Sequence, residues 1–534
     1  MFGRGDKVKD LTTKTLLPPG DLATTSAYDM GEVTYYEHEW ERQLAQMYLA
    51  PSDSSQASSD AKAQDMIRAS STSAGDTSTS SSPALVGFKG MENLPTELLC
   101  KVFWHCTSNY TPISTNGPSM PLILSQVSSQ WRSVAMAFPW LWNEVVIDCG
   151  DWSNMPKLVK CAHYHLERSG DLPISIYTSG SIRPSSQGPA DTNAIHQLVS
   201  PYASRIWHTT LAFPLDWLNN FLRNTASIEE VQSLESLKLV YHPTEGSGQL
   251  ADNNLFIHAP KLRKVELEYA SELGWRYLAQ NTVHLPWSQI EELNFIHIVA
   301  SPSYLQYMLV RCVTLEKCTL SIVKVAEEIT NQFHFLIPHP PQLNHISLPS
   351  IKRLTLYNPK NFDYIKYLAG LRIHFPSLEH FGIASGGDPR NGRQWSHTQF
   401  KQFITEANVL LRSVSTPAHI SDADIESIIG EVPSLVELDV SEGSSISETT
   451  VRLMLQGYLA SQLEVLKCAV APELLSNFLD MVESRFVPRK SKAKYRGFKK
   501  LVIRCPKDSD GYREVEERVE ELQELGRDIT VVDA

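Results

Sequence analysis

The sequence predicts an α/β fold in which a small all-helical module precedes a solenoid of stacked strand–helix units. Three observations predict this order. A serine- and threonine-rich N-terminal stretch gives way near Val86 to two amphipathic helical patterns, and beyond Trp142 a short apolar pattern recurs along the rest of the chain. The expected organisation is a largely disordered region at 1–86, a helical domain at 87–145 and a repeat domain at 146–534.

The N-terminal region has a composition that does not favour a packed core. From Pro51 to Pro83 it consists mainly of Ser, Thr, Ala, Asp and Gln, with few large apolar residues. Such a segment buries too little surface to offset about 1–2 kcal/mol of backbone entropy per residue, so we expect a disordered linker. A short helix is expected near 36–50, where Trp40, Leu44 and Met47 recur at helical spacing.

Two stretches of the next segment have the spacing of amphipathic helices. The first, "LPTELLCKVFWHC", places Pro95 in the first turn, where its missing N–H costs nothing. Its apolar face comprises Leu98, Leu99, Val102, Phe103 and Cys106, and that of the second, "LILSQVSSQWRSVAMAF", comprises Val127, Trp131, Val134 and Ala135. Two or three short helices make a small core, so their bulky apolar groups are expected to pack on something else, either a partner or the end of the repeat domain.

After a predicted strand at "NEVVIDC", an apolar residue followed three and five residues later by two more recurs nine times. The copies are "LESLKL", "LRKVEL", "IEELNF", "LEKCTL", "IKRLTL", "LEHFGI", "LVELDV", "LEVLKC" and "FKKLVI", beginning at 234, 262, 290, 315, 351, 378, 435, 463 and 498. Weaker copies stand at "IWHTTL" (Ile206) and "LRSVST" (Val414). Spacing near 28 residues, with helical patterns between the strands, predicts a leucine-rich-repeat-like solenoid with one continuous core. The acidic segment Arg513 to Leu525 is expected to form a helix that caps its C-terminal end.

Composition excludes several classes of protein. A formal charge of -12 and a pI near 5.8 argue against a general nucleic-acid binder, and no segment has the length and apolar character of a signal peptide or membrane span. The eight cysteines lack zinc-type pairing, which favours reduced, buried thiols. We therefore expect a soluble protein of the cytoplasm, the nucleus or both. The common catalytic signatures are absent, so we expect no enzyme activity and no cofactor.

Three further segments have alternative interpretations. Cys161, His163 and His165 lie close in sequence, but helical residues two apart point away from each other, which argues against a metal site. His334, His339 and His345 fall in a proline-interrupted loop that we interpret as an insertion. The basic tract from Arg485 to Lys500 is either a patch for nuclear import or an anionic partner, or a solvated loop before the last repeat strand.

The text "LPTELLCKVFWHC" followed by "PLILSQVSSQWRSVAMAFPWLW" resembles the F-box, in particular fungal-type F-box-like proteins with divergent leucine-rich repeats. The segment "HLERSGDLPISIY" is similar to the link into that family's repeat domain. The resemblance implies a Skp-type adaptor of a cullin–RING ubiquitin ligase as partner, with a protein substrate captured by the repeats. Arg132 is implied to be a structural or interface residue. The implied adaptor-binding residues are Leu94, Pro95, Glu97, Leu98, Leu99, Val102, Phe103, Val127, Trp131, Leu141 and Trp142.

In each repeat, strand residues that alternate with the leucines are expected to point away from the core and to contact the substrate. The candidates are Lys238, Glu266, Glu268, Asn294, Thr355, Tyr357, Asp439 and Lys467. Two alternatives remain. The helical module is a non-ligase cap on a repeat scaffold, since solenoids need capped ends, or the chain is an enzyme without a known motif.

Overall fold

The computed structural model describes most of the chain beyond Asn93. The described residues are 94–107, 119–148, 155–179, 192–214, 218, 221, 231–242, 255–269, 284–299, 302–324, 346–358, 373–385, 397–407, 409–416, 420–486, 496–513 and 515–533. The predicted N-terminal region with its helix near 36–50 lies outside them, as do the loop histidines 334, 339 and 345 and residues 487–495 of the basic tract.

Three α-helices form the module that the first amphipathic patterns predict: α3 (Thr96–Thr107), α4 (Met120–Val127) and α5 (Ser129–Ala137), followed by the 3₁₀ turn η1 (Pro139–Leu141). Ser128 separates α4 from α5 because its backbone is extended, and its hydroxyl accepts a hydrogen bond from the Trp131 N–H at 3.1 Å. This cap satisfies one of the otherwise unpaired N–H groups of the first turn of α5.

The three helices enclose an apolar core of their own. The Phe103 and Trp131 rings lie 5.0 Å apart between centroids, and Leu99 and Phe103 have no exposed surface. The other buried apolar residues of the module are Cys100, Leu124, Val134, Ala135, Phe138, Leu141 and Trp142. The expectation that these helices need further packing is met at Trp142, which contacts the first repeat as described below.

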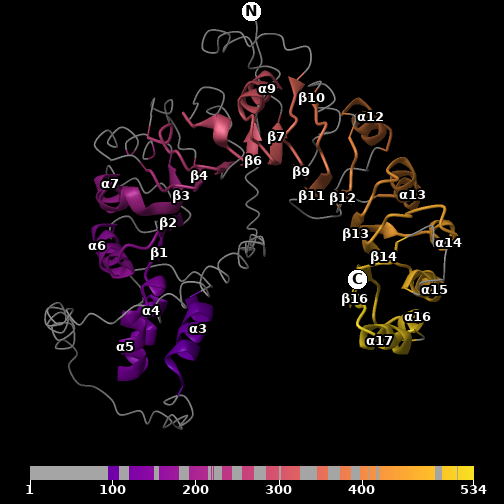
Figure 1. The fold of residues 1–534 in the computed structure, drawn as a ribbon, viewed down its shortest axis with the longest axis horizontal. Helices are drawn as coiled ribbons and strands as arrows, with labels where there is room; N and C mark the ends of the chain where they lie inside the picture. The colour runs from indigo at the N-terminus through magenta and orange to yellow at the C-terminus, as the bar shows by residue number, and fades with distance from the viewer. Residues whose placement is uncertain are drawn as a thin grey trace, which may run out of the picture. The chain divides into compact units, whose positions relative to one another are not determined.

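The described residues beyond the module form a parallel sheet of 14 strands whose order follows the chain from β1 to β16, omitting β8 and β10 (Figure 1). This order confirms the predicted solenoid of parallel strands. The strands are β1 (Glu144–Asp148), β2 (Ile174–Ser179), β3 (Ile206–Pro214), β4 (Ser236–His242), β5 (Lys264–Tyr269), β6 (Glu292–Val299), β7 (Lys317–Lys324), β9 (Arg353–Asn358), β11 (His380–Ser385), β12 (Ser413–Ser415), β13 (Glu437–Ser445), β14 (Val465–Ala469), β15 (Lys500–Arg504) and β16 (Asp528–Val532).

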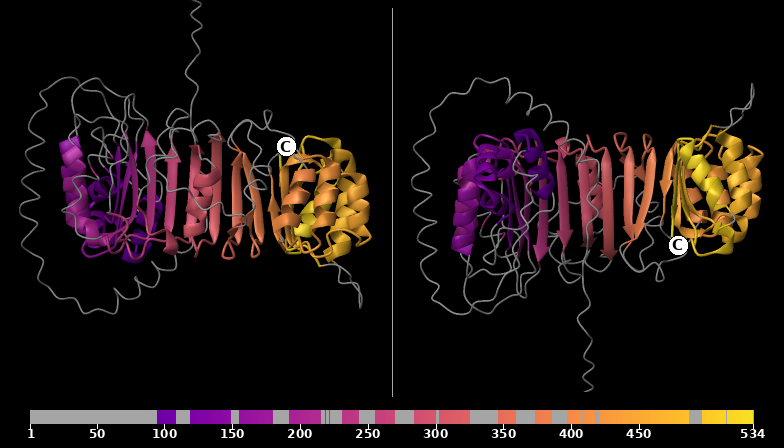
Figure 2. Two further views of the ribbon diagram at one scale, coloured as in Figure 1. Left: turned by 90° about the horizontal axis from the view of Figure 1, so that it is seen from above. Right: turned by 90° about the horizontal axis from the view of Figure 1, so that it is seen from below.

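Helices cover one face of this sheet, as both views of Figure 2 show for the C-terminal repeats. Ser421 and Ser447 begin two of them, α13 and α14, with hydroxyls that accept from the backbone N–H three residues on. The α-helices are α6 (Met155–Leu166), α7 (Thr192–Val199), α9 (Pro302–Arg311), α12 (His397–Ala407), α13 (Asp422–Glu431), α14 (Glu448–Leu455), α15 (Leu475–Phe486), α16 (Asp510–Arg513) and α17 (Glu516–Glu524). The 3₁₀ turns are η3 (Glu167–Ser169), η4 (Ser200–Arg205), η7 (Trp287–Gln289) and η9 (Pro472–Leu474).

The second apolar position of the repeat pattern forms a buried row from strand to strand. Each member is paired in register with the next and is at most 7% exposed, so the core is continuous along the sheet. From β1 to β16 the row is Val145, Ile176, Thr209, Leu237, Val265, Leu293, Cys318, Leu354, Phe381, Val414, Leu438, Leu466, Leu501 and Ile529. The weak copies at Ile206 and Val414 are therefore true strands, β3 and β12.

The described residues depart from the predicted strand–helix repeat in two places. The acidic helix α17 is followed by β16, so the prediction that this helix ends the solenoid was wrong. The two-residue strands β8 (Ile346–Ser347) and β10 (Ile373–His374) pair in parallel as a separate small sheet.

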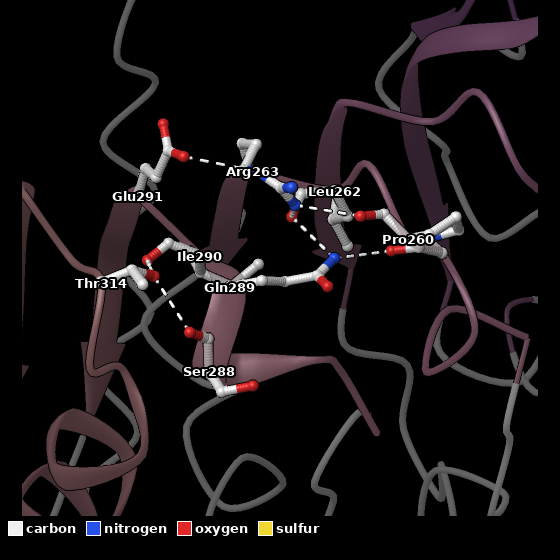
Figure 3. Close-up of polar contacts among 9 residues, drawn as sticks. Pro260, Leu262, Arg263, Ser288, Gln289, Ile290, Glu291 and Thr314 are labelled. Atoms are coloured by element: carbon white, nitrogen blue, oxygen red, sulfur yellow. Dashed lines mark hydrogen bonds and ion pairs between the residues drawn. The ribbon is translucent and has the colours of Figure 1, made fainter.

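Polar side chains form hydrogen bonds between the turns of successive repeats (Figure 3). The Gln289 amide donates to the carbonyls of Ala259 at 2.7 Å and Leu262 at 3.0 Å, in the preceding repeat. In the next repeat, the Thr314 hydroxyl donates to the carbonyls of Ser288 and Ile290, both at 3.0 Å. These bonds join the turn of one repeat to carbonyls of the preceding repeat, beside the strand ladder, and so they hold successive repeats together.

The same device recurs further along the chain. Ser350 donates to the carbonyl of Val313 and Ser434 to that of Leu411, both at 2.7 Å. Each of these polar residues stands directly before the first apolar residue of its repeat pattern. The four residues are Gln289, Thr314, Ser350 and Ser434. We call these residues the turn ladder.

Candidate functional site: two interaction surfaces

The predicted adaptor-binding residues divide into a buried and an accessible group. Leu99, Phe103, Trp131, Leu141 and Trp142 are buried in the module's own core, whereas Leu94 and Val102 are half-buried. Pro95 and Glu97 are exposed, as is Leu98 at 47% and Val127 at 58%. A partner approaching the module therefore meets the second group, while the first group holds the helices together.

The exposed apolar side chains Leu98 and Val127 lie at the same end of the module. The Gln130 side chain donates to the Leu94 carbonyl at 3.4 Å, which brings the segment before α3 to the junction of α4 and α5. Leu98 is in the first turn of α3, and Val127 ends α4 at that junction. Ile123, one turn before Val127, is also exposed and shares its face of α4. We call Leu98, Ile123 and Val127 the apolar end of the module.

Trp142 connects the module to the first repeat. Its indole Nε1 donates to the Ala135 carbonyl at 2.8 Å, and its ring lies 5.0 Å from the imidazole of His165 on α6. The guanidinium of Arg168 also lies over the indole, 5.3 Å from the ring centroid. This indole, implied by the resemblance to be an adaptor contact, has no exposed surface and acts as the joint between the two parts.

The second surface is the face of the sheet opposite the buried row. The fifth position of each repeat pattern forms a register row across all strands of the described sheet, and nearly all of its residues are half-buried. From β1 to β16 this fifth-position row is Val146, Tyr177, Thr210, Lys238, Glu266, Asn294, Thr319, Thr355, Gly382, Ser415, Asp439, Lys467, Val502 and Thr530.

Ion pairs within the sheet engage the charged members of the row. Lys238 Nζ lies 2.6 Å from Glu266 and 2.8 Å from Glu268. Burial lowers the pKa of Lys238, but the two carboxylates outweigh burial and raise that pKa above its ordinary value. Lys467 Nζ lies 2.9 Å from Asp439, and this hydrogen bond raises the Lys467 pKa despite partial burial. These five predicted substrate residues therefore already form ion pairs with one another.

The centre of the row is uncharged. Asn294, Thr319, Thr355 and Ser415 are half-buried, and their side chains have no hydrogen-bond partner among the described residues. Gly382 stands between Thr355 and Ser415. Of the remaining candidates, Tyr357 belongs to β9, but its side chain lies outside the described part of the structure.

Sequence reasoning named only some members of this row. Thr319, Gly382, Ser415 and Val502 occupy the same fifth position as Lys238 and Asn294, so the repeat pattern itself contained the signal. On the module, Ile123 was missed because burial of individual apolar residues depends on how three short helices pack, which no spacing specifies.

The Cys161, His163 and His165 cluster is divided by the structure. Cys161 is exposed, His163 Nδ1 is 3.3 Å from the Tyr202 hydroxyl, and His165 is buried. Burial, together with the nearby Arg168 charge, lowers the His165 pKa to about 4. Within the described ranges, no group of three or more His, Cys, Asp or Glu side chains is placed to hold a metal ion. None of the described helices has the length and apolar character of a membrane span.

The chain has little sequence similarity to known proteins. No family model matches the chain, and no curated protein matches it. Among solved structures, an internalin from Listeria monocytogenes matches with 10% sequence identity and a TM-score of 0.23, covering 59% of this chain and 88% of the internalin. Because so low a TM-score does not establish a shared fold, the solenoid assignment depends on the strand order and register described above.

Proposed function

We propose that the chain is the substrate-recognition subunit of a Skp–cullin–F-box type ubiquitin ligase. In this proposal the helical module docks a Skp-type adaptor and the strand face of the repeats captures a protein target. The observation that carries the proposal is the apolar end of the module: the F-box-like text "LPTELL" begins a helix whose first turn exposes Leu98, at the same end as Val127.

The burial pattern supports docking at this end. Leu99 and Phe103 already complete the interior of the module, so Leu98 and Val127 are not needed there. Full burial of a large aliphatic side chain contributes about 1.5–3 kcal/mol, and because these side chains are half-exposed, covering each contributes about half of that. Three such residues on two helices make a compact contact for an adaptor, with polar groups such as Glu97 beside them.

In this proposal the repeats bind the target and catalyse no reaction. The ligase subunit acts by holding its target near a ubiquitin-loaded enzyme, which raises the effective concentration of the target's lysines. A broad strand face with polar side chains from many repeats suits the binding of a protein.

The second candidate is a repeat interaction scaffold whose helical module only caps the sheet. The contact of Trp142 with His165 favours it, because this contact covers the beginning of the solenoid. The two functions share the strand face and differ at the apolar end of the module.

Capture of a purified Skp-type adaptor by the full chain separates them. The variant carrying Leu98→Asp and Val127→Asp should lose capture while its circular dichroism and unfolding midpoint stay close to those of the parent. Leu525→Asp, at a side chain that is 72% exposed beyond α17, is the matched control and should capture normally. Equal capture by all three proteins would contradict docking at the apolar end, and no capture by the parent would contradict the ligase proposal and favour the scaffold.

A further inference from the structure

Gly382 leaves a gap in the strand face between β9 and β12. Its register partners on the two neighbouring strands are Thr355 of β9 and, on β12, Ser415. His380 lies two residues before Gly382 and therefore on the same face of the sheet. Its register partner on β9 is Arg353. Because alternate strand residues share a face and neighbouring strands lie about 4.8 Å apart, these four side chains surround the gap.

Arg353 is an exposed cation that pairs with none of the described residues. The described residues offer its guanidinium no ion pair and no hydrogen bond, and the same holds for the hydroxyls of Thr355 and Ser415. The two acidic residues of the same register row have other partners, a hydroxyl for Glu437 and a lysine for Glu292. Glu437 accepts a hydrogen bond from Ser413 at 3.1 Å, and Glu292 pairs with Lys317 at 3.3 Å. Glu437 keeps its negative charge, because its partner is a neutral hydroxyl, but it stands three strands away from Arg353. The guanidinium of Arg353 is therefore a positive charge beside the gap that no ion pair with the described residues neutralises.

The other groups around the gap are donors suited to an anion. Burial and the Arg353 charge lower the pKa of His380, against the opposing effect of Glu379 and Glu437. His380 is accordingly neutral near pH 7, and Arg353 supplies the full charge. A planar guanidinium binds a carboxylate through two parallel hydrogen bonds, and a hydroxyl on either side donates a further bond.

The gap is also accessible to a chain. Arg353 is exposed, Thr355, His380 and Ser415 are half-buried, and the helices α12 and α13 lie on the other face of the sheet (Figure 1). A glycine with small neighbours lets an extended segment approach the strands closely, where larger side chains would hold it away.

We infer that the strand face between β9 and β12 binds an acidic segment of a partner protein, with an Asp or Glu carboxylate seated over Gly382. Arg353 forms the ion pair, and the hydroxyls of Thr355 and Ser415 donate to the remaining carboxylate lone pairs. This inference rests on the proposed function only in that the strand face captures the target, and it is independent of adaptor docking.

A positional-scanning library of ten-residue peptides, presented to the full chain, tests the inference. Bound peptides should be enriched in Asp or Glu at one position, with Gln or Lys there disfavoured, and the enrichment should weaken as salt rises. Arg353→Gln should reduce affinity for the best peptide by about tenfold or more, the usual effect of losing a charge-assisted hydrogen bond.

Two further variants make the result specific. A Cβ at position 382 would meet nothing nearer than the Thr355 hydroxyl oxygen at 3.6 Å, so Gly382→Ala should fold normally yet weaken the acidic peptide by filling its place. Arg452→Gln, which removes an exposed arginine of helix α14 instead, should bind like the parent.

Three results would overturn the inference: no acidic preference, an acidic preference that Arg353→Gln leaves intact, or binding only of peptides with phosphoserine at that position. Failure here leaves adaptor capture through Leu98 and Val127 untouched. Conversely, loss of adaptor capture in the Leu98 and Val127 variant leaves peptide binding at Arg353 unchanged, so the two proposals fail separately.

Discussion

The indole of Trp142 lies against the imidazole of His165, with ring centroids 5.0 Å apart and planes inclined at 59°. Trp142 closes the helical module, and His165 belongs to α6, which packs on the first strand of the sheet. Both side chains are buried, so the module and the first repeat share one apolar layer at this contact. The Trp142–His165 contact therefore stabilises both parts locally.

Replacing Trp142 by alanine should destabilise the chain by about 3–5 kcal/mol, the usual cost of truncating a buried large aromatic. Because the indole contacts both parts, hydrogen exchange should accelerate in α3–α5 and in α6. Trp131→Ala is the control, since its ring contacts Phe103 within the module, and it should accelerate exchange in α3–α5 alone. Identical exchange patterns in the two variants would contradict a joint at Trp142.

His165 makes stability sensitive to mild acid. Burial and the Arg168 charge lower its pKa from 6.5 to about 4, so between these values the unfolded chain binds a proton that the folded chain does not. The stability linked to neutral His165 is fully present above pH 6.5 and is lost as the pH falls toward 4. At pH 5 the free energy of unfolding should be lower by about 2 kcal/mol.

Urea unfolding at pH 7 and pH 5 measures this loss. The parent should lose more stability between the two pH values than His165→Phe, which keeps an aromatic ring against Trp142 and cannot titrate. An equal loss in both proteins would show that other groups cause the acid sensitivity.

The turn ladder should contribute measurably to stability. Gln289→Ala removes two hydrogen bonds to the carbonyls of Ala259 and Leu262, and should cost about 1–2 kcal/mol in denaturant unfolding. Gln289→Glu keeps the shape but replaces the donor by a carboxylate facing those carbonyls, so it should cost more. Gln126→Ala, at an exposed position of α4, should leave the unfolding midpoint unchanged. A similar midpoint for the Gln289 and Gln126 variants would refute the structural role.

The repeat domain was predictable because a period of two within each strand and about 28 residues between strands is written directly in the sequence. Even the weak copy at Val414 forms a strand, since its neighbours on both sides supply pairing partners. The last strand was missed because "DITVV" lacks the leucine spacing of the other copies and pairs with β15 across the sheet.

In the helical module, the sequence could not predict which apolar side chains are buried. Leu98 and Leu99 are adjacent, about 100° apart on a helix, so spacing alone allows either to face inward. Packing of α3 against α4, α5 and η1 decides, and it places Leu99 inside and Leu98 outside. The Gly382 gap was missed for another reason: Arg353 and Gly382 come from different repeats, and only the register brings them together.

The most direct test of adaptor docking is hydrogen exchange of the full chain with and without a saturating Skp-type adaptor. Docking at the apolar end predicts slower exchange in α3 around Leu98 and in α4 around Val127, with the strands β9 to β12 unchanged. No added protection in α3 and α4, or protection confined to the strand face, would contradict the account.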